Sequence, residues 1–356
     1  MNKHIRTFYL MVISTLLVTV YSCSENKSTN SAKEIFIDFD NIEIVDLTKG
    51  KEIELEFSDS SIIRSIDELR VYDKSHYLIR SRSDLLHFDT NGNFKNQIGR
   101  KGNGPMEFTN FSSFFVKNNT VHIYDFMGKR IIKYDWDGNY LNALSLKDIY
   151  SDIVPNYIYP LANNQFISKN TFGGDHRQTP SYSILDENFK ITSNIADRYL
   201  ENGITFSNIF FADENAILFW EIFNDTVFSV SNDTTFAPKY FINFNTKAIP
   251  SNIKSLDTYD IIDFTNKPES KSKHATLIRC VYEDAHYLRF IFVHNAEVHY
   301  VKSNKANNVT KTYKLSYPDK TVEPLIFFED NTLIVPVNSF EDEANPSLIV
   351  LDEGAL

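Results

Sequence analysis

The sequence predicts an all-β protein, a six-bladed β-propeller of four-stranded blades whose last blade is closed by an N-terminal strand. Three observations carry this prediction: a strand-and-turn pattern that recurs six times, a last copy that lacks its fourth strand, and an unassigned strand ahead of the first copy. The composition agrees, because 14% of the residues are aromatic and Gly and Pro number only 11 each among 356 residues.

Each copy of the pattern begins with a polar turn that leads into an apolar strand. These strands begin at Tyr77, Val121, Phe166, Ile217, Tyr287 and Leu333. Most intervals are about 45 residues, the length of one four-stranded propeller blade. A later strand in each copy ends in a second turn, as in residues 85–92 and 131–138, where Asn-Gly or Asp-Gly can supply the positive φ of a tight hairpin.

The closure of the ring is predicted from the two ends of the repeat array. The sixth copy stops at Leu356, directly after its second turn, whereas residues 52–57 form a strand that belongs to no copy. We expect this strand to complete the last blade and remove its exposed edge. Residues 35–47 also alternate between apolar and polar side chains, as a strand does. We expect them to add to the same edge or to pack beneath it.

One interval, between blades four and five, is about 70 residues and contains a polar insertion at residues 245–274. Long insertions in regular arrays are usually functional loops or disordered ones. This insertion connects an outer strand to the next inner strand. We expect it on the same face as the hairpins between second and third strands, overhanging one mouth of the central channel.

The N-terminal residues are typical of a bacterial lipoprotein signal. Residues 1–22 contain a short basic start and an apolar run of about fourteen residues, and they end in Val-Tyr-Ser before Cys23. We expect Cys23 to be lipidated, residues 23–34 to be a flexible tether, and residues 35–356 to form the propeller. The protein is then expected in the cell envelope, lipid-anchored to the outer or inner membrane, without a transmembrane helix.

Blade two resembles a known repeat. Residues 121–138 look like an NHL-type propeller repeat, and residues 98–108 are similar to the Gly-Pro-x-Glu-aromatic segment of six-bladed propeller lipoproteins of Gram-negative bacteria. The resemblance implies the fold and export, and most members of that family have no assigned activity. Propeller lactonases hold a calcium ion in the channel with Glu, Asn and Asp, but no matching set is identified here.

Several classes of site are not expected. The net charge of −11 disfavours nucleic acid as a partner. The glycines of residues 99–104 are followed by Pro105, which does not fit a phosphate-binding loop, and Cys280 is expected to be a buried, inert thiol. His294 and His299 are five apart across a predicted hairpin and are not expected to share a face. No metal or cofactor is therefore predicted.

The candidate binding residues are cationic side chains on the loop-rich face: Arg80, Arg82, Arg100, Lys101, Lys129, Arg130, His176, Arg177 and His294. Gathered at one face of an acidic protein, they would attract an anionic ligand, although ordinary solvated loops would look the same. Three functions stay open at this point. They are a non-catalytic domain that binds a protein, peptide or glycan, a lactonase- or lyase-type enzyme with a channel-bound divalent metal, and a structural component of the envelope.

Overall fold

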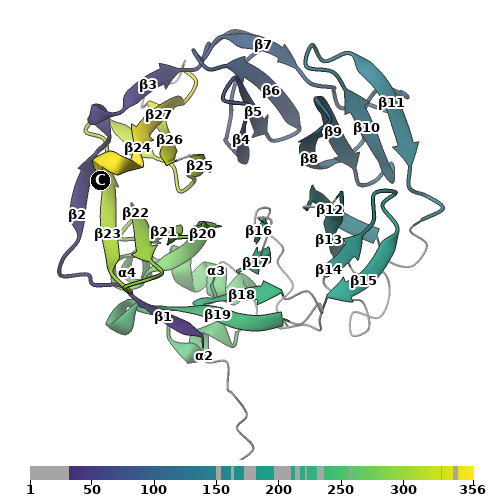
Figure 1. The fold of residues 1–356 in the computed structure, drawn as a ribbon. Helices are drawn as coiled ribbons and strands as arrows, with labels where there is room; N and C mark the ends of the chain where they lie inside the picture. The colour runs from purple at the N-terminus through teal and green to yellow at the C-terminus, as the bar shows by residue number, and fades with distance from the viewer. Residues whose placement is uncertain are drawn as a thin grey trace, which may run out of the picture.

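The computed structural model is a ring of six blades arranged around a central axis (Figure 1). It describes residues 32–149, 154–161, 164–171, 182–195, 210–212, 217–220, 223–230, 236–256, 258–329, 331–339 and 344–356. The predicted six-bladed β-propeller is thereby confirmed. The predicted lipid attachment site, Cys23, lies outside these residues.

The strands of each blade follow one another outward from the axis. Blades one to three are β4 (Glu68–Tyr72), β5 (His76–Ser81), β6 (Asp84–Asp89) and β7 (Phe94–Gln97); β8 (Phe111–Lys117), β9 (Thr120–Asp125), β10 (Arg130–Tyr134) and β11 (Tyr140–Ser145); and β12 (Val154–Pro160), β13 (Phe166–Thr171), β14 (Tyr182–Leu185) and β15 (Ile191–Ile195). Blades four to six are β16 (Phe210–Ala212), β17 (Ile217–Phe219), β18 (Thr226–Val230) and β19 (Phe236–Asn243); β20 (Thr276–Glu283), β21 (Tyr287–His294), β22 (Glu297–Asn304) and β23 (Thr310–Ser316); and β24 (Lys320–Val322) with β25 (Phe327–Glu329), β26 (Thr332–Ser339) and β27 (Ser347–Asp352).

The hydrophobic core lies between the blades. Each of six clusters of buried side chains joins two neighbouring sheets, as where Leu78 and Leu85 of blade one pack with Phe114 and Ile123 of blade two. Side chains alternate between the two faces of a strand, so a blade inside the ring presents apolar residues to both neighbours. This explains the long apolar strands of the sequence pattern.

The second turn of the pattern is a carboxylate-capped hairpin. Asp89 accepts the backbone N–H groups of Asn91 and Asn93, at 2.9 and 3.0 Å from Oδ1, and Asp135 does the same in blade two. Gly92 and Gly138 follow with φ of 87° and 80°, a conformation that costs an L-residue energy. The repeated Asp-x-x-Gly spacing therefore has a local structural cause.

Residues 33–54 form a belt around the outside of blades four, five and six (Figure 1). Its last strand, β3 (Lys51–Glu54), pairs antiparallel with β27 and confirms the predicted closure of the last blade. Its first two strands, β1 (Lys33–Phe36) and β2 (Glu43–Asp46), are parallel fifth strands on β19 and β23. The expectation that residues 35–47 join or underlie the edge of blade six is thus wrong, because they extend blades four and five instead.

The insertion folds into short helices: η2 (Asn245–Lys247), α2 (Ser251–Lys254), α3 (Thr258–Asn266) and α4 (Pro268–Lys273). The N–H of Asn295, in the turn between β21 and β22, donates to the carbonyl of Lys271 at 2.8 Å. The insertion therefore lies on the predicted face, that of the hairpins between second and third strands. In Figure 1 its helices lie over blades four and five, to one side of the centre of the ring. None of the helices in the described residues is long and apolar enough to cross a membrane.

Candidate functional site

Six of the predicted cationic residues lie on the loops and strand ends of blades one and two, but three arginines among them are used internally. Arg130 donates from Nε to Asp125 at 3.1 Å, and its terminal nitrogens reach backbone carbonyls of the loop between β7 and β8, including that of Glu107. Asp125 is fully buried and also accepts the N–H of Asn110 at 2.9 Å and that of Gly128 at 3.2 Å. Arg130 therefore closes a buried network and is poorly placed to meet a ligand.

Arg100 and Arg80 are also paired. Arg100 donates to Glu107 at 2.8 Å, and the other oxygen of Glu107 accepts the N–H of Gly104 at 2.9 Å. This second contact, assisted by Arg100, lowers the pKa of Glu107. The Gly-Pro-x-Glu segment is thus a loop folded around its own carboxylate. Arg80 donates to the carbonyl of Ser112 at 2.6 Å and lies over the ring of Phe111, which joins blade one to blade two.

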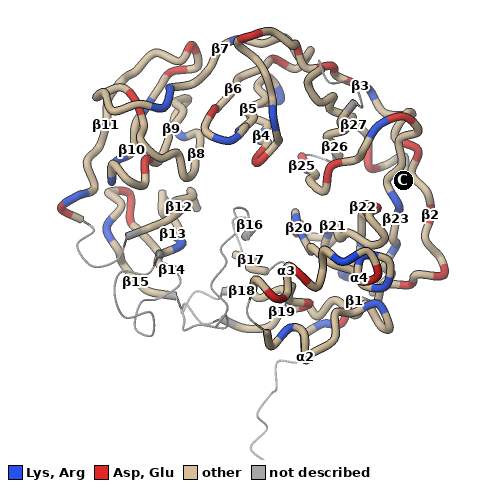
Figure 2. The backbone as a smooth tube through the Cα atoms, turned by 180° about the vertical axis from the view of Figure 1, so that it is seen from behind, with Lys and Arg blue, Asp and Glu red and all other residues tan. Residues whose placement is uncertain are grey.

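The remaining predicted residues are dispersed. Arg82 and Lys101 are exposed, and Lys129 occupies the turn between β9 and β10 at φ 47°. His176 and Arg177 lie outside the described residues. Figure 2 shows basic and acidic segments interspersed around the ring. His294 lies on blade five, beside a groove of about 660 Å³.

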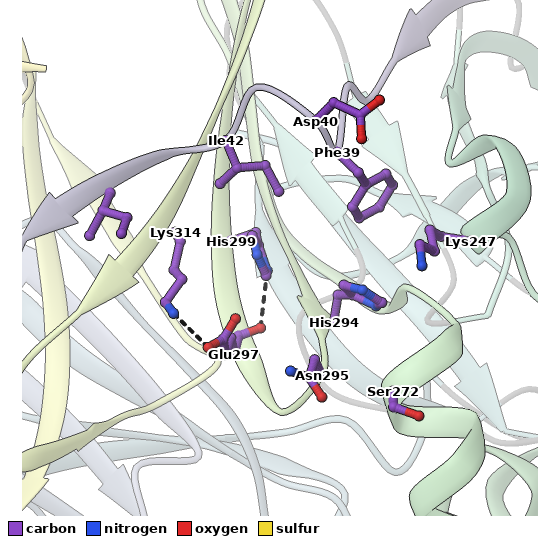
Figure 3. Close-up of a pocket in the computed structure, with 11 residues that line it drawn as sticks. Phe39, Asp40, Ile42, Lys247, Ser272, His294, Asn295, Glu297, His299 and Lys314 are labelled. Atoms are coloured by element: carbon purple, nitrogen blue, oxygen red, sulfur yellow. Dashed lines mark hydrogen bonds and ion pairs between the residues drawn. The ribbon is translucent and has the colours of Figure 1, made fainter.

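Three segments distant in sequence form this blade-five groove (Figure 3). The belt contributes residues of its 39–44 segment, the insertion contributes Lys247 and Ser272, and blade five contributes residues of its 294–299 hairpin together with Lys314. Phe39 packs edge-on against His294, with ring centroids 5.2 Å apart. The belt thus contributes three apolar side chains and the exposed Asp40, and the blade contributes mostly polar ones.

Two histidines line the groove in fixed orientations. The Nδ1 atom of His299 is 3.2 Å from the carbonyl oxygen of Glu297. The Nδ1 atom of His294 is 3.3 Å from the carbonyl oxygen of His274. A carbonyl oxygen only accepts, so each Nδ1 must carry the hydrogen, and each Nε2 is left as an acceptor. Burial lowers the pKa of His299 to about 4 and also lowers the pKa of His294, so both imidazoles are neutral at pH 7.

The expectation that His294 and His299 would not share a face is wrong. The hairpin has the two-residue turn Asn295–Ala296, with φ of 54° and 60°, and its register pairs Phe292 with His299. His294 is two residues beyond Phe292, on the same side of the sheet. The ring centroids of the two histidines are 6.2 Å apart. No group of three potential metal ligands occurs among the described residues.

The groove also carries charged groups. Lys314 pairs with Glu297 at 2.6 Å, so these two charges largely neutralise each other. Lys247 forms no ion pair with any described residue, although its positive charge contributes to the lowered pKa of His294. The groove therefore offers the cation of Lys247 and two neutral acceptors, together with the exposed acidic side chain of Asp40, which also forms no ion pair with a described residue.

A second polar cluster lies on the inner strands. Arg70 donates to Glu68 at 2.7 Å, and its guanidinium is 5.6 Å from the ring centroid of Tyr159 in blade three. Blades one and three are separated by blade two, so this contact joins two inner strands that are not neighbours in the ring. Oε2 of Glu68 is buried and has no hydrogen-bond partner in the described part of the chain. The side chains of β16 in blade four lie outside that part.

Sequence reasoning identified His294 but missed the partners that make it part of a groove. The relevant signals were the polar insertion and the alternating N-terminal segment. Each was recognised, but neither could be placed against blade five, because the pairing of β2 with β23 joins residues about 270 apart in the chain.

Comparisons with known proteins agree with the fold. A crystal structure of a Bacteroides fragilis protein named as a candidate for export aligns with a TM-score of 0.67, over 90% of this chain and 99% of that chain, at 19% identity. A member of the DUF4221 family from Bacteroides vulgatus aligns with a TM-score of 0.57, over 88% of this chain and all of that chain, at 10% identity. These identities indicate a shared fold and no more.

Curated proteins provide no significant match to the sequence. The model of a domain of unknown function, DUF4934, matches residues 34–351, which include the belt and all six blades. The chain therefore belongs to the DUF4934 family, and its propeller is the domain that defines the match.

Proposed function

We propose that this protein is an exported, lipid-anchored binding domain that holds a hydroxyl-rich ligand of glycan type in the blade-five groove. The signal at residues 1–22 and Cys23 support export and anchoring. Non-catalytic binding is favoured over lactonase or lyase chemistry because the imidazoles of the groove are neutral, the carboxylate of Glu297 is paired with Lys314, and the other acidic side chain, Asp40, is exposed to solvent. The cationic loops of blades one and two are less suitable, because Arg80, Arg100 and Arg130 already have partners there.

The observation that carries the proposal is the pair of oriented histidines. The two Nε2 atoms can accept hydrogen bonds from hydroxyl groups. An anionic ligand would be repelled by their lone pairs. Lys247 and the amide of Asn295 can donate to hydroxyl oxygens, and the belt supplies an apolar wall that includes Phe39. A few fixed polar groups on a partly apolar surface are typical of small-ligand sites.

The test is a titration of the purified protein with a panel of neutral oligosaccharides, first by thermal shift and then by calorimetry. We expect at least one glycan to bind, and we expect His294→Ala and Lys247→Ala each to weaken that binding about tenfold or more. A tenfold loss corresponds to about 1.4 kcal/mol, the scale of one hydrogen bond to a polar or charged group. His286→Ala, at an exposed histidine in the turn between β20 and β21, should bind as the parent does.

Three outcomes would contradict this function. If no glycan binds, or if both groove variants bind like the parent, the groove is not a glycan site. Binding of extended peptides in the same panel, lost in the same variants, would assign the groove to peptide recognition instead.

A further inference from the structure

A pair of exposed aromatic side chains lies where the chain emerges from the propeller. β1 is the outermost strand of blade four, and Ile35 is buried, whereas Phe36 beside it is 49% exposed. Phe241 on the neighbouring strand β19 is 40% exposed. The parallel register pairs Glu34 with Phe241 and Phe36 with Asn243, so the two rings lie on the same outward face.

The position of this strand limits where the membrane can be. Cys23 precedes Lys33, the first residue of β1, by only ten residues. Even a fully extended chain of that length spans at most roughly 35 Å. If Cys23 carries the lipid, the outer flank of blade four is held close to the bilayer throughout.

We infer that the flank of blade four formed by β1 and β19 faces the bilayer, with Phe36 and Phe241 inserted at its interface. This inference rests on the lipid anchor in the proposed function and goes beyond it by fixing the orientation of the ring. Exposed aromatic rings favour the interfacial region of a membrane, where apolar surface leaves water and polar groups stay hydrated. The hydrophobic contact adds to the acyl anchor, which holds the surface at high local concentration.

Blade two provides a matched control. Its outer strand, β11, exposes Leu141 to 46%, similar to Phe36, but it lies far around the ring from β1 (Figure 1). If exposure of apolar side chains alone determined contact with the bilayer, the two flanks would contact it equally. Proximity to the tether distinguishes them.

The experiment uses the full mature protein with its native N-terminal modification, reconstituted in vesicles of phosphatidylethanolamine and phosphatidylglycerol that contain nitroxide-labelled lipid. A fluorophore is attached at Phe36→Cys, Phe241→Cys or Leu141→Cys in a Cys280→Ala background. We expect several-fold stronger quenching at positions 36 and 241 than at position 141. Thermal unfolding of each variant confirms that the propeller is intact.

Equal quenching at the three positions of an acylated protein would overturn the inference and leave the anchor standing. A blue shift of the probe at position 36 that depends on protein concentration without vesicles would also overturn it, by assigning the flank to a second copy of the chain. Mass spectrometry of the N-terminal peptide shows whether Cys23 is acylated. If Cys23 carries no lipid, the proposed anchor fails and this inference fails with it.

Discussion

Blades two and five have the same four-strand order, but blade two is built from its own segment of chain whereas blade five also uses two distant ones. In blade two, Arg130 and Asp125 organise a loop that precedes the blade directly. In blade five, β2 of the belt covers the outer edge and α4 of the insertion packs on a hairpin. The regular blade uses its polar groups internally, and the groove forms where non-repeat segments are added.

We expect the largest loss of stability when the belt is deleted and the repeats are left intact. Deleting residues 32–57 removes β1, β2 and β3 together with fully buried side chains such as Leu47, and exposes the edge of blade six. We expect aggregation or loss of cooperative unfolding, measured by size-exclusion chromatography and thermal circular dichroism. Closure by the belt is disproved if the truncated protein melts cooperatively at the parent temperature.

Point variants refine that test. Leu47→Ala should lower the free energy of unfolding by about 2–5 kcal/mol, because it leaves a cavity in the core between blades five and six. Ile44→Ala, in the same belt but 68% exposed, should change it by less than about 0.5 kcal/mol. Similar losses from both variants would mean that the belt is not packed as described.

The next largest effect concerns the joint between blades five and six. The buried Arg289 donates to both carboxylate oxygens of Glu353, at 2.8 and 3.0 Å. Glu353→Gln should destabilise the protein by about 1–3 kcal/mol in chemical denaturation at pH 7, because it removes one of the two carboxylates that pair with the buried Arg289 and leaves only Asp284, at 2.5 Å. Glu297→Gln, at a half-exposed pair with Lys314, should cost less than about 1 kcal/mol.

The same pair predicts a pH dependence. Burial alone would raise the pKa of Glu353, but the hydrogen bonds from Arg289 and Tyr300 outweigh burial and lower it. A carboxyl whose pKa is lower in the folded state stabilises the fold above its unfolded pKa of about 4.3, and this stability is lost as the pH falls through the folded value. The difference between the parent and Glu353→Gln should therefore shrink below about pH 4. A difference that stays constant down to pH 2.5 would contradict this assignment.

Two neighbouring arginines test the view that blade two uses its charges internally. Arg130→Ala leaves Asp125 buried with fewer donors and should cost about 1–3 kcal/mol in urea unfolding. Arg100→Ala removes a largely exposed pair with Glu107 and should cost less than about 1 kcal/mol. If Arg130→Ala is as stable as the parent, that arginine is available for a ligand after all.

The smallest effect compares two equivalent histidines. His122 in blade two and His299 in blade five each stack on a phenylalanine at 4.8 Å, and burial lowers the pKa of each to about 4. A histidine with a lowered pKa stabilises the fold above about pH 6.5, and this stability is lost as the pH falls toward 4. Replacing either by Phe should reduce the loss of stability between pH 7 and pH 5 by roughly 1–2 kcal/mol, measured by urea unfolding.

Ligand binding should distinguish the same two variants, because His299 lines the groove and His122 does not. His299→Phe should abolish glycan binding, and His122→Phe should leave it unchanged. Equal loss in both variants would indicate a general effect on the fold and not a site in blade five.

The repeated parts of this molecule were predictable because their causes are local. The Asp-x-x-Gly turns at Asp89 and Asp135 cap their own backbones, and the closing strand was found because one copy lacked a partner. The positions of β1 and β2 were not predictable, because an alternating strand can pair with any free edge. The internal roles of Arg100 and Arg130 were hidden for a related reason, since a cation in a loop looks the same whether or not a carboxylate folds back to it.

The groove on blade five is the central claim, and hydrogen–deuterium exchange with the bound glycan tests it most directly. The backbone amides of residues 39–44, 245–247 and 294–299 should become protected when the ligand is added, whereas residues 98–108 of the blade-two loop and the inner strand β4 should exchange as before. Protection centred on residues 98–108 or on β4, with none in the groove, would contradict the account and move the binding site to the cationic loops or to the channel.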